Sequence, residues 1–334
     1  MKNENPNMEV PTKEIIGELE YSLFRIGAFR AGIELHLWGK IASGEDTAAK
    51  IADQEGWDLA GARILLDAMC SLKLLSKEGD HYNLVPESAF YLVPGKPTYL
   101  GDLLLYEYHW DGNGRFSDII RTGKRPMKDE ATSPDLVPVW IADYSRRWTR
   151  PECYFEMEKS LWQSLDIQPR DGLRVLDIAC GPAPHSMELA RQHPGVRLTW
   201  VDWEEVLQTA VKVAGDLGIA GQISLLPGDL WSVDYGKELY EIAYLGDVSH
   251  FFGQDENTLL FHKVHTALVS GGVIVINSVA RREIEEKVWD GLWLYVATAS
   301  GGLYDFGEYK SMLESAGFTN VEDINKGPIR AEKT

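Results

Sequence analysis

The sequence has few cysteines, no long apolar run and no leader-like start. Cys70, Cys153 and Cys180 are the only cysteines among 334 residues. They form neither a disulfide framework nor a metal-site spacing, so we expect no bound metal and a reducing, cytoplasmic setting. No apolar run reaches the roughly 18 residues of a membrane span, so we expect no membrane partner. Residues 1–12 are polar and lack the apolar core of a signal peptide.

Basic side chains are also scarce. Lysine and arginine number 33 against 51 aspartates and glutamates, which gives a net charge of −18. A surface of this sign repels nucleic acid at long range, so we expect no nucleic-acid partner. Apolar residues make up 44% of the chain, which is enough for a buried core, and the length allows two domains or one large one.

The N-terminal segment, residues 13–95, has a helical pattern at its start. Apolar side chains recur at three- and four-residue steps from Glu14 to Ile41, and they occupy several faces. Because such a helix is rarely solvated, we expect it to be buried against a partner subunit. Short helices over 47–54 and 59–74, then a turn into a strand at 81–85, complete an order typical of a winged helix.

The most informative stretch runs from Val175 to Val279, where apolar strands alternate with helices. A turn of short residues at 179–183 follows the first strand, and the acids Asp202 and Asp229 follow the next two. In a doubly wound sheet this order gathers the turn and both acids at the carboxyl ends of parallel strands, where an adenosine ligand binds. The sequence therefore predicts an α/β domain over 169–334, with S-adenosyl-L-methionine as cofactor and methyl transfer as reaction.

Taken in order, the motifs resemble a known enzyme family. The resemblance rests on the helical start, the Arg121-Thr122-Gly123 loop, the turn at 179–183, Asp202-Trp203, Pro227-Gly228-Asp229, residues 247–252, Gly301-Gly302, and residues 306–310 and 316–318. This series is similar to that of the small-molecule O-methyltransferases with an N-terminal winged-helix dimerisation domain. The resemblance implies a class I methyltransferase Rossmann-like fold, a homodimer, and a helical linker over 96–168 that borders the pocket of the methyl acceptor.

The resemblance also implies a set of cofactor-binding positions. Asp202 would accept hydrogen bonds from the ribose, Trp203 would lie against the adenine, and Asp229 would accept from the adenine amino group. Gly181 would allow the backbone to approach the methionine part. The complete set is Asp177, Ala179, Gly181, Ala183, Asp202, Trp203, Asp229, Leu230, Gly246 and Asp247. The family prefers glycine at positions 179 and 183, where this chain has alanine.

His250 occupies the position of the family's general base, and a neutral imidazole suits that role. The family orients this histidine with two glutamates, for which the sequence offers Asn277 and Tyr304. Both departures remove a negative charge that would strengthen the base. His250 is therefore either the catalytic base or a residue that lines the pocket.

A thioether acceptor needs no base, because its sulfur attacks without losing a proton. The aromatic side chains of 96–168 would stabilise the sulfonium product, and Arg147 would pair with a substrate carboxylate. These features are similar to the branch that S-methylates 4-methylthio-2-hydroxybutyrate on the route to dimethylsulfoniopropionate. The expected acceptor-binding residues are Tyr106, His109, Trp110, Tyr144, Arg147, Trp148, Met157, Phe251, Asn277, Trp293 and Tyr304.

Three alternatives remain open at this stage. The first is an O-methyltransferase of a hydroxylated metabolite with His250 as general base. A winged helix could also serve a DNA-binding regulator, although the acidic composition disfavours it. Finally, the chain could bind S-adenosylmethionine without transferring its methyl group.

Overall fold

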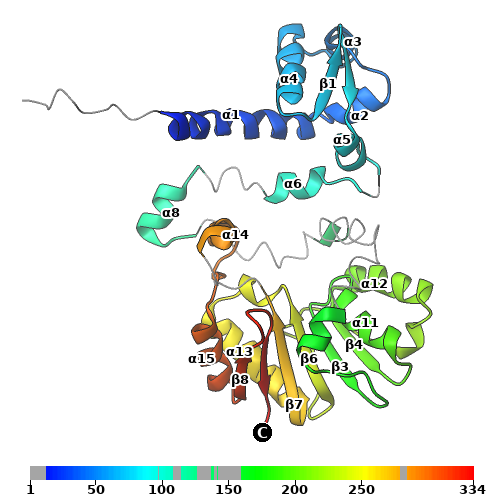
Figure 1. Cartoon of the computed structure of the whole chain (residues 1–334), viewed down its shortest axis with the longest axis vertical. Coiled ribbons are helices and arrows are strands. Elements are labelled where there is room, and N and C mark those ends of the chain that lie inside the picture. Colours follow the sequence, from blue (N-terminus) through cyan, green and yellow to red (C-terminus); the bar gives the residue numbers. More distant parts are fainter. Residues whose placement is uncertain are drawn as a thin grey trace, which may run out of the picture. The chain divides into compact units, whose positions relative to one another are not determined.

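The structure is a computed structural model that describes residues 13–96, 98–107, 114–125, 137–138, 141, 159–278 and 284–334. At 106–107 and 284–287 it describes the backbone alone. The chain divides into two compact units, one that ends at Leu105 and one that starts at Tyr106 (Figure 1). Each unit is described by itself.

The N-terminal unit is a small helical fold with one β-hairpin. Its elements are α1 (Glu14–Glu34), α2 (Leu37–Ala42), α3 (Ala48–Glu55), α4 (Leu59–Ser71), β1 (Leu75–Glu78), β2 (His81–Leu84), α5 (Pro86–Tyr91) and α6 (Gly101–Glu107). Thr47 and Asp58 cap α3 and α4, because their side chains accept hydrogen bonds from the backbone N–H of Lys50 and Gly61. The predicted helices at 47–54 and 59–74 and the strand at 81–85 are thus present as α3, α4 and β2.

The prediction of one continuous helical pattern from Glu14 to Ile41 is wrong, because the structure has two helices there. His36 adopts a left-handed backbone with a φ of 51°, so α1 ends and α2 starts in a new direction. This break brings Trp38 against Gly32, where an added Cβ would lie 2.8 Å from the indole ring. The core of the unit forms around this contact. Its buried members include Ile33, Leu37, Trp38, Ile51, Leu66, Met69 and Tyr82.

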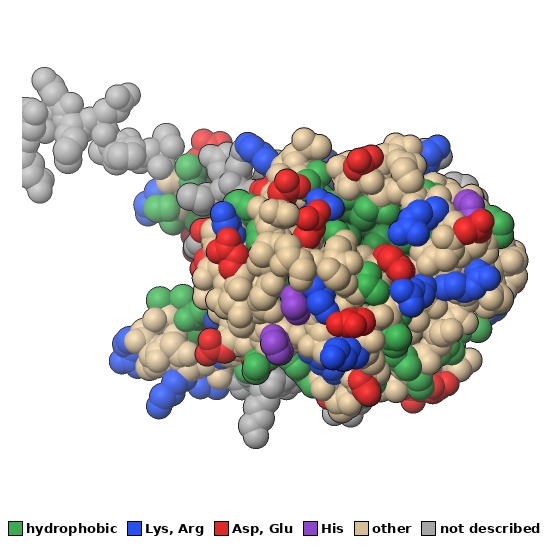
Figure 2. All heavy atoms as spheres, turned by 90° about the horizontal axis from the view of Figure 1, so that it is seen from below, with side chains coloured by type: hydrophobic (Ala, Val, Ile, Leu, Met, Phe, Trp, Pro, Cys, Tyr) green, Lys and Arg blue, Asp and Glu red, His purple; other side chains and the backbone are tan. Residues whose placement is uncertain are grey.

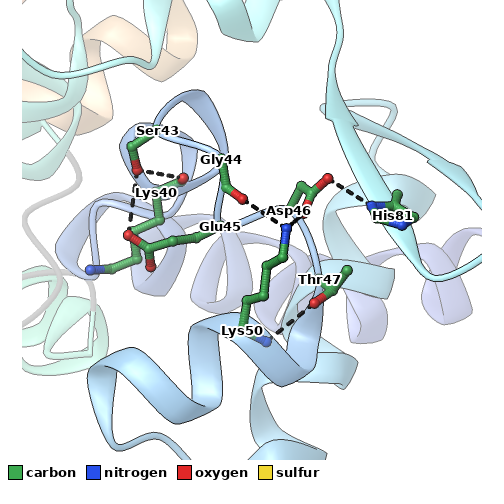
Figure 3. A network of polar contacts seen from close by, with 8 residues as sticks. All are labelled: Lys40, Ser43, Gly44, Glu45, Asp46, Thr47, Lys50 and His81. Atoms are coloured by element: carbon green, nitrogen blue, oxygen red, sulfur yellow. Dashed lines mark hydrogen bonds and ion pairs between the residues drawn. The ribbon is translucent and has the colours of Figure 1, made fainter.

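A polar network ties the loop before α3 to the hairpin (Figure 3). The Asp46 carboxylate accepts a hydrogen bond from Lys50 Nζ at 2.6 Å and contacts His81 Nδ1 at 2.7 Å. These two bonds lower the pKa of Asp46 to about 2. The backbone N–H of Tyr82 also donates to the Asp46 carbonyl, at 2.7 Å. The loop and the strand β2 are therefore fixed to each other by main-chain and side-chain bonds.

The C-terminal unit is built on a seven-stranded sheet with the order β5-β4-β3-β6-β7-β9-β8. The strands are β3 (Arg174–Ile178), β4 (Arg197–Asp202), β5 (Ile223–Pro227), β6 (Tyr240–Gly246), β7 (Leu268–Asn277), β8 (Thr319–Asp323) and β9 (Ile329–Glu332). β3 to β7 run parallel, whereas β9 pairs antiparallel with both β7 and β8. The strand order reverses between β3 and β6, which opens a crevice at their carboxyl ends.

Helices cover both faces of this sheet. They are α11 (Pro184–Gln192), α12 (Glu204–Asp216), α13 (Gln254–Ala267) and α15 (Phe306–Ser315). The unit also contains α8 (Phe116–Thr122), α14 (Ile284–Ala297) and the short 3-10 turns η3 (Ala220–Gln222) and η4 (Ser249–Phe251). On one face, Leu176 and Ile178 share a core with α13 and α15. On the other face, Val175 packs with α11 and α12. This alternation buries both faces, as expected of a parallel sheet.

The observed architecture confirms the predicted fold class. It is an α/β doubly wound sheet of the class I methyltransferase type, preceded by a mainly helical N-terminal region. The turn follows β3, Asp202 ends β4 and Asp229 follows β5. Because these three strands are parallel neighbours, the fold places the turn and both acids on one edge of the sheet.

Candidate functional site

The turn after β3 is held in an uncommon backbone conformation. Ala179, Gly181 and Ala183 have φ angles of 52°, 55° and 53°. A left-handed backbone costs a non-glycine residue about 1 kcal/mol or more, so alanine at 179 and 183 is strained. The positions where the family resemblance implies glycine are thus positions that require it physically. The surrounding sheet holds the strained turn, since Cys180 N donates to Val201 O at 3.2 Å.

Asp202 joins this turn to the end of β4. Its Oδ2 accepts the backbone N–H of Gly181 at 2.8 Å, and its Oδ1 accepts that of Trp203, also at 2.8 Å. Burial raises the pKa of Asp202 to about 6, although both N–H groups oppose the shift. Each carboxylate oxygen keeps a further lone pair, so Asp202 can accept two more hydrogen bonds at the crevice.

Asp177 supports the turn from inside the sheet. This carboxylate is buried and accepts a hydrogen bond from the Ser186 hydroxyl, at the start of α11. Ser186 in turn accepts the indole N–H of Trp200 at 3.0 Å. The chain of bonds links β3, α11 and β4 beneath the turn, so Asp177 has a structural partner within the protein.

Asp229 and Leu230 lie in a loop that α13 holds in place. The Asp229 carboxylate accepts the backbone N–H of Trp231 at 2.9 Å. Lys263 of α13 donates from Nζ to the carbonyls of Leu230 and Trp231 at 2.7 and 3.0 Å. The Tyr235 hydroxyl donates to the Leu230 carbonyl at 2.7 Å.

Lys263 was not among the residues predicted from the sequence. Burial lowers its pKa, against the opposing effect of Asp229 and Asp234. The ammonium also lies 4.0 Å from the centre of the Tyr235 ring. The contact itself is long-range and could not be read from spacing.

The connection after β6 approaches the same edge of the sheet. An added Cβ at Gly246 would lie 2.7 Å from the Tyr244 ring, so this position admits no side chain without a shift. Asp247 has a φ of 51°, and its N–H donates to the Asn277 carbonyl at 2.8 Å. Trp203 precedes α12 and is partly exposed. These residues therefore sit at the ends of β6 and β4, where the sequence predicted them.

His250 lies in η4 and is buried, with 6% of its surface exposed. Its Nδ1 is 2.7 Å from the Ser278 hydroxyl. Burial alone lowers the pKa of His250 to about 4, so the imidazole is neutral at physiological pH. Among the residues that the structure describes, no carboxylate bonds to this ring.

The two residues that replace the family's glutamates have other partners. The side-chain amide of Asn277 donates to the Tyr244 hydroxyl at 3.1 Å. The Tyr304 hydroxyl donates to the Phe252 carbonyl at 2.7 Å. Neither side chain forms a hydrogen bond with His250 in the described part of the chain.

One predicted acceptor-binding aromatic, Phe251, lies against His250, and a second, Trp293, lies near Phe251. The Phe251 ring lies 4.4 Å from the imidazole, centre to centre, and 6.1 Å from the Trp293 ring. The side chain of Tyr106 and the residues His109, Trp110, Tyr144, Arg147, Trp148 and Met157 lie outside the described part of the structure. The aromatic contribution to the site is therefore described only through Phe251 and Trp293.

Metal-binding groups and membrane-spanning helices are both absent from the part of the chain that the structure describes. No group of three or more His, Cys, Asp or Glu side chains there is placed to hold a metal ion. None of the helices described is long and apolar enough to cross a membrane.

Comparisons with known proteins agree with this geometry. Residues 157–319 match the family model of the O-methyltransferase domain, just under half of the chain. The 3-hydroxy-5-methyl-1-naphthoate 3-O-methyltransferase of Streptomyces sahachiroi is 26% identical over 333 residues, which cover 96% of this chain and 92% of that enzyme. The L-tyrosine C(3)-methyltransferase of Streptomyces lavendulae is 27% identical over 341 residues, with 94% and 91% covered.

A solved structure, PigF with SAH, has the same fold. It superposes with a TM-score of 0.74 at 18% identity, and covers 97% of this chain and 100% of that one. At this identity the likeness concerns the fold alone. The matched domain and the curated relatives lead to one conclusion: this chain is an S-adenosylmethionine-dependent methyltransferase whose residues 157–319 are similar to the O-methyltransferase domain.

Proposed function

We propose that the enzyme methylates a small molecule, and that a thioether acid such as 4-methylthio-2-hydroxybutyrate is its first candidate acceptor. The observation that carries this choice is the environment of His250, which is buried, neutral and without a carboxylate partner among the described residues. A base of this kind gives little help to an acceptor that must lose a proton. A thioether sulfur has no proton to lose.

The residues at the crevice fit the cofactor. Asp202 keeps two free acceptor positions that would take hydrogen bonds from the ribose hydroxyls. The Asp229 carboxylate would accept from the adenine amino group, and Leu230 would pack on the adenine ring. The strained turn at 179–183, Gly246 and Asp247 offer close backbone approach for the amino-acid end. When bound, S-adenosylmethionine supplies an electrophilic methyl group. Trp203 completes the set as a partly exposed aromatic side chain next to Asp202.

The protein's own part in the reaction is then mainly positioning and exclusion of water. Fixing two reactants in register accounts for a large share of rate enhancement in such reactions. Phe251 places an aromatic ring next to His250, with the Trp293 ring near Phe251, and an aromatic face stabilises a sulfonium cation by roughly 0.5–2 kcal/mol. Arg147, with Tyr144, Trp148 and Met157, would hold the carboxylate end of the acceptor.

O-Methylation of a hydroxylated metabolite is the second candidate. It is favoured by the function of the Streptomyces sahachiroi relative, which methylates the 3-hydroxyl of a naphthoate. In this case Nε2 of His250 would take the hydroxyl proton. A phenolic or enolic acceptor of low pKa would suit such a weak base best.

An acceptor panel distinguishes the two candidates. Purified enzyme is incubated with thioether acids and with hydroxylated aromatics, and S-adenosylhomocysteine is quantified between pH 6 and 9. For a thioether acceptor, we expect a rate that is independent of pH in this range and falls less than about tenfold in His250→Gln, because no base is needed. Turnover of hydroxylated acceptors alone, with a loss of about 100-fold in His250→Gln, would reject the thioether proposal.

We also propose that the chain acts as a homodimer through a winged-helix-like domain at 13–95, with a linker at 96–168 and the cofactor domain at 169–334. The outer face of α1 supports this, because Ile15, Leu19 and Leu23, which follow one another at four-residue steps, are 75%, 68% and 63% exposed in the single chain. Apolar side chains this exposed along one helix indicate a protein partner. A second copy is the simplest occupant, since an isologous contact pairs the helix with itself.

A nucleic-acid partner is disfavoured. On the face drawn in Figure 2, Lys and Arg side chains are interspersed with Asp and Glu, without an extended basic field. The net charge of −18 points the same way. We place the enzyme in the cytoplasm, on the strength of its scarce cysteines.

A further inference from the structure

Ser278 is the first residue after β7, and its hydroxyl lies 2.7 Å from Nδ1 of His250. We propose that Ser278 is the positioning residue of His250: the serine oxygen accepts the Nδ1–H, fixes that tautomer, and leaves Nε2 as the nitrogen available to the acceptor molecule. This inference rests on the proposed function for the role of His250. It assigns to a serine the orienting task that the resemblance assigns to glutamates.

The backbone that carries His250 is already fixed. The His250 carbonyl accepts the N–H of Gly302 at 2.9 Å, and an added Cβ at Gly301 would lie 2.4 Å from the same oxygen. Asn257 donates from Nδ2 to the carbonyls of Ser249 and Phe252, at 2.9 and 3.1 Å. With the main chain held from three sides, ring orientation is the remaining freedom. Ser278 is the group that restricts it.

The direction of the hydrogen bond follows from burial. In the described part of the chain, Nε2 of His250 has no hydrogen-bond partner, whereas Nδ1 has Ser278. A buried N–H without an acceptor is more costly than a buried acceptor without a donor. The proton is therefore better placed on Nδ1, where the serine oxygen accepts it. The Nε2 lone pair then has no competing hydrogen-bond donor among the residues that the structure describes.

Charged groups on the neighbouring elements are engaged elsewhere. Glu256 of α13 accepts from the backbone N–H of Gly253 and from the Ser300 hydroxyl. Arg125 donates to the Gly301 carbonyl and lies over the Tyr295 ring. Asp247 lies in the connection between β6 and η4. It does not shift the pKa of His250, which burial alone lowers.

The chemical consequence is an oriented but weak base. A carboxylate on Nδ1 would stabilise the imidazolium that forms when Nε2 takes a proton, whereas a neutral hydroxyl holds the ring without that stabilisation. The Ser278–His250 pair therefore orders the acceptor by a hydrogen bond at Nε2. This suits an acceptor that reacts without full transfer of a proton to the protein.

Histidine NMR of the cofactor-free protein tests the pairing directly. Ring nitrogen and carbon shifts report tautomer and pKa, and His250→Gln identifies the His250 signals. We expect one neutral tautomer, with the proton on Nδ1, from pH 5 to 8. In Ser278→Ala both tautomers should appear, and Ser278→Thr should restore the single one. In Ser278→Asp, the added carboxylate should raise the pKa of His250 by at least about one unit. A wild-type proton on Nε2, or an unchanged tautomer in Ser278→Ala, would overturn the inference.

Kinetics give a second readout. With the thioether acceptor, Ser278→Ala should lower kcat, but by no more than the loss of less than about tenfold expected for His250→Gln, because Ser278 acts only through that ring. Its dissociation constant for S-adenosylhomocysteine, measured by calorimetry, should stay within about twofold, because Ser278 is not placed in the cofactor set. Thr258→Ala, which removes an exposed hydroxyl from α13, is the matched control. Equal kcat in Ser278→Ala and the wild type would contradict positioning. If no thioether acid were methylated, the proposed function would be rejected. The NMR measurement would still test the hydrogen bond between Ser278 and His250.

Discussion

The hydroxyl of Tyr304 donates a 2.7 Å hydrogen bond to the backbone carbonyl of Phe252, 52 residues earlier in the chain. This bond ties the loop before α15 to the end of η4, the turn that carries His250. Burial raises the pKa of Tyr304 to about 12, so the hydroxyl stays protonated and able to donate at physiological pH. Tyr304 therefore supports the site through the main chain, and in the described part of the chain it forms no hydrogen bond with His250.

Replacing Tyr304 by phenylalanine should destabilise the fold by about 1 kcal/mol, because it removes one buried hydrogen bond while Asn257 still donates to the same carbonyl. Urea unfolding followed by circular dichroism measures the change. Tyr240→Phe is the matched control, since Tyr240 is buried and its hydroxyl has no hydrogen bond in the described part of the chain. Equal losses in both variants would mean that the Phe252 bond contributes nothing specific.

Cofactor affinity should depend on the ionisation of Asp202. Its pKa of about 6 means that the carboxyl is largely protonated at pH 5 and largely ionised at pH 7. Only the ionised form offers all its lone pairs to ribose hydroxyls, so affinity should rise with pH. The gain from pH 5 to pH 7 should be about tenfold, which follows the ionised fraction.

Calorimetry with S-adenosylhomocysteine across this pH range measures that slope. Asp202→Asn should bind about tenfold or more weakly at pH 7, since a charge-assisted acceptor is lost. It should also show no comparable rise between pH 5 and 7. A slope that persists in the variant would assign the pH dependence to another group.

Lys263 should support cofactor binding from a distance. In Lys263→Met the carbonyls of Leu230 and Trp231 lose their ammonium donor, so the loop that carries Asp229 becomes less ordered. We expect the dissociation constant of S-adenosylhomocysteine to rise about three- to tenfold, which corresponds to the net free energy of about one hydrogen bond. Lys310→Met, which removes an exposed lysine of α15 paired with Glu314, should leave it unchanged. Identical affinities in both variants would exclude a supporting role.

Charge on the outer face of α1 should prevent self-association. The double variant Leu19→Asp and Leu23→Asp places two carboxylates on the same exposed apolar face, where a partner would have to desolvate them. Light scattering at micromolar concentration should show a dimer for the wild type and a monomer for the variant. Leu259→Asp changes an equally exposed leucine, 68% accessible, on α13 and should remain dimeric. A monomeric wild type would refute the dimer.

Local sequence determined much of the C-terminal unit. Alternating apolar strands and helices indicated a doubly wound sheet, and the acids Asp202 and Asp229 marked the strand ends. This worked because the ends of parallel strands share one edge of a sheet, so position along the chain translates into position in space. The departures at Asn277 and Tyr304 were also visible, since they are substitutions within recognisable motifs.

Tertiary structure alone decided which side chains meet. The partner of His250 is Ser278, 28 residues away, and the amide of the suspected Asn277 turns to Tyr244 instead. The contact of Lys263 with the loop of Leu230, 33 residues earlier, and the break of the first helix at His36 were equally hidden. Periodicity reports which face of an element is apolar, whereas hydrogen-bond partners depend on how elements from distant parts of the chain pack together.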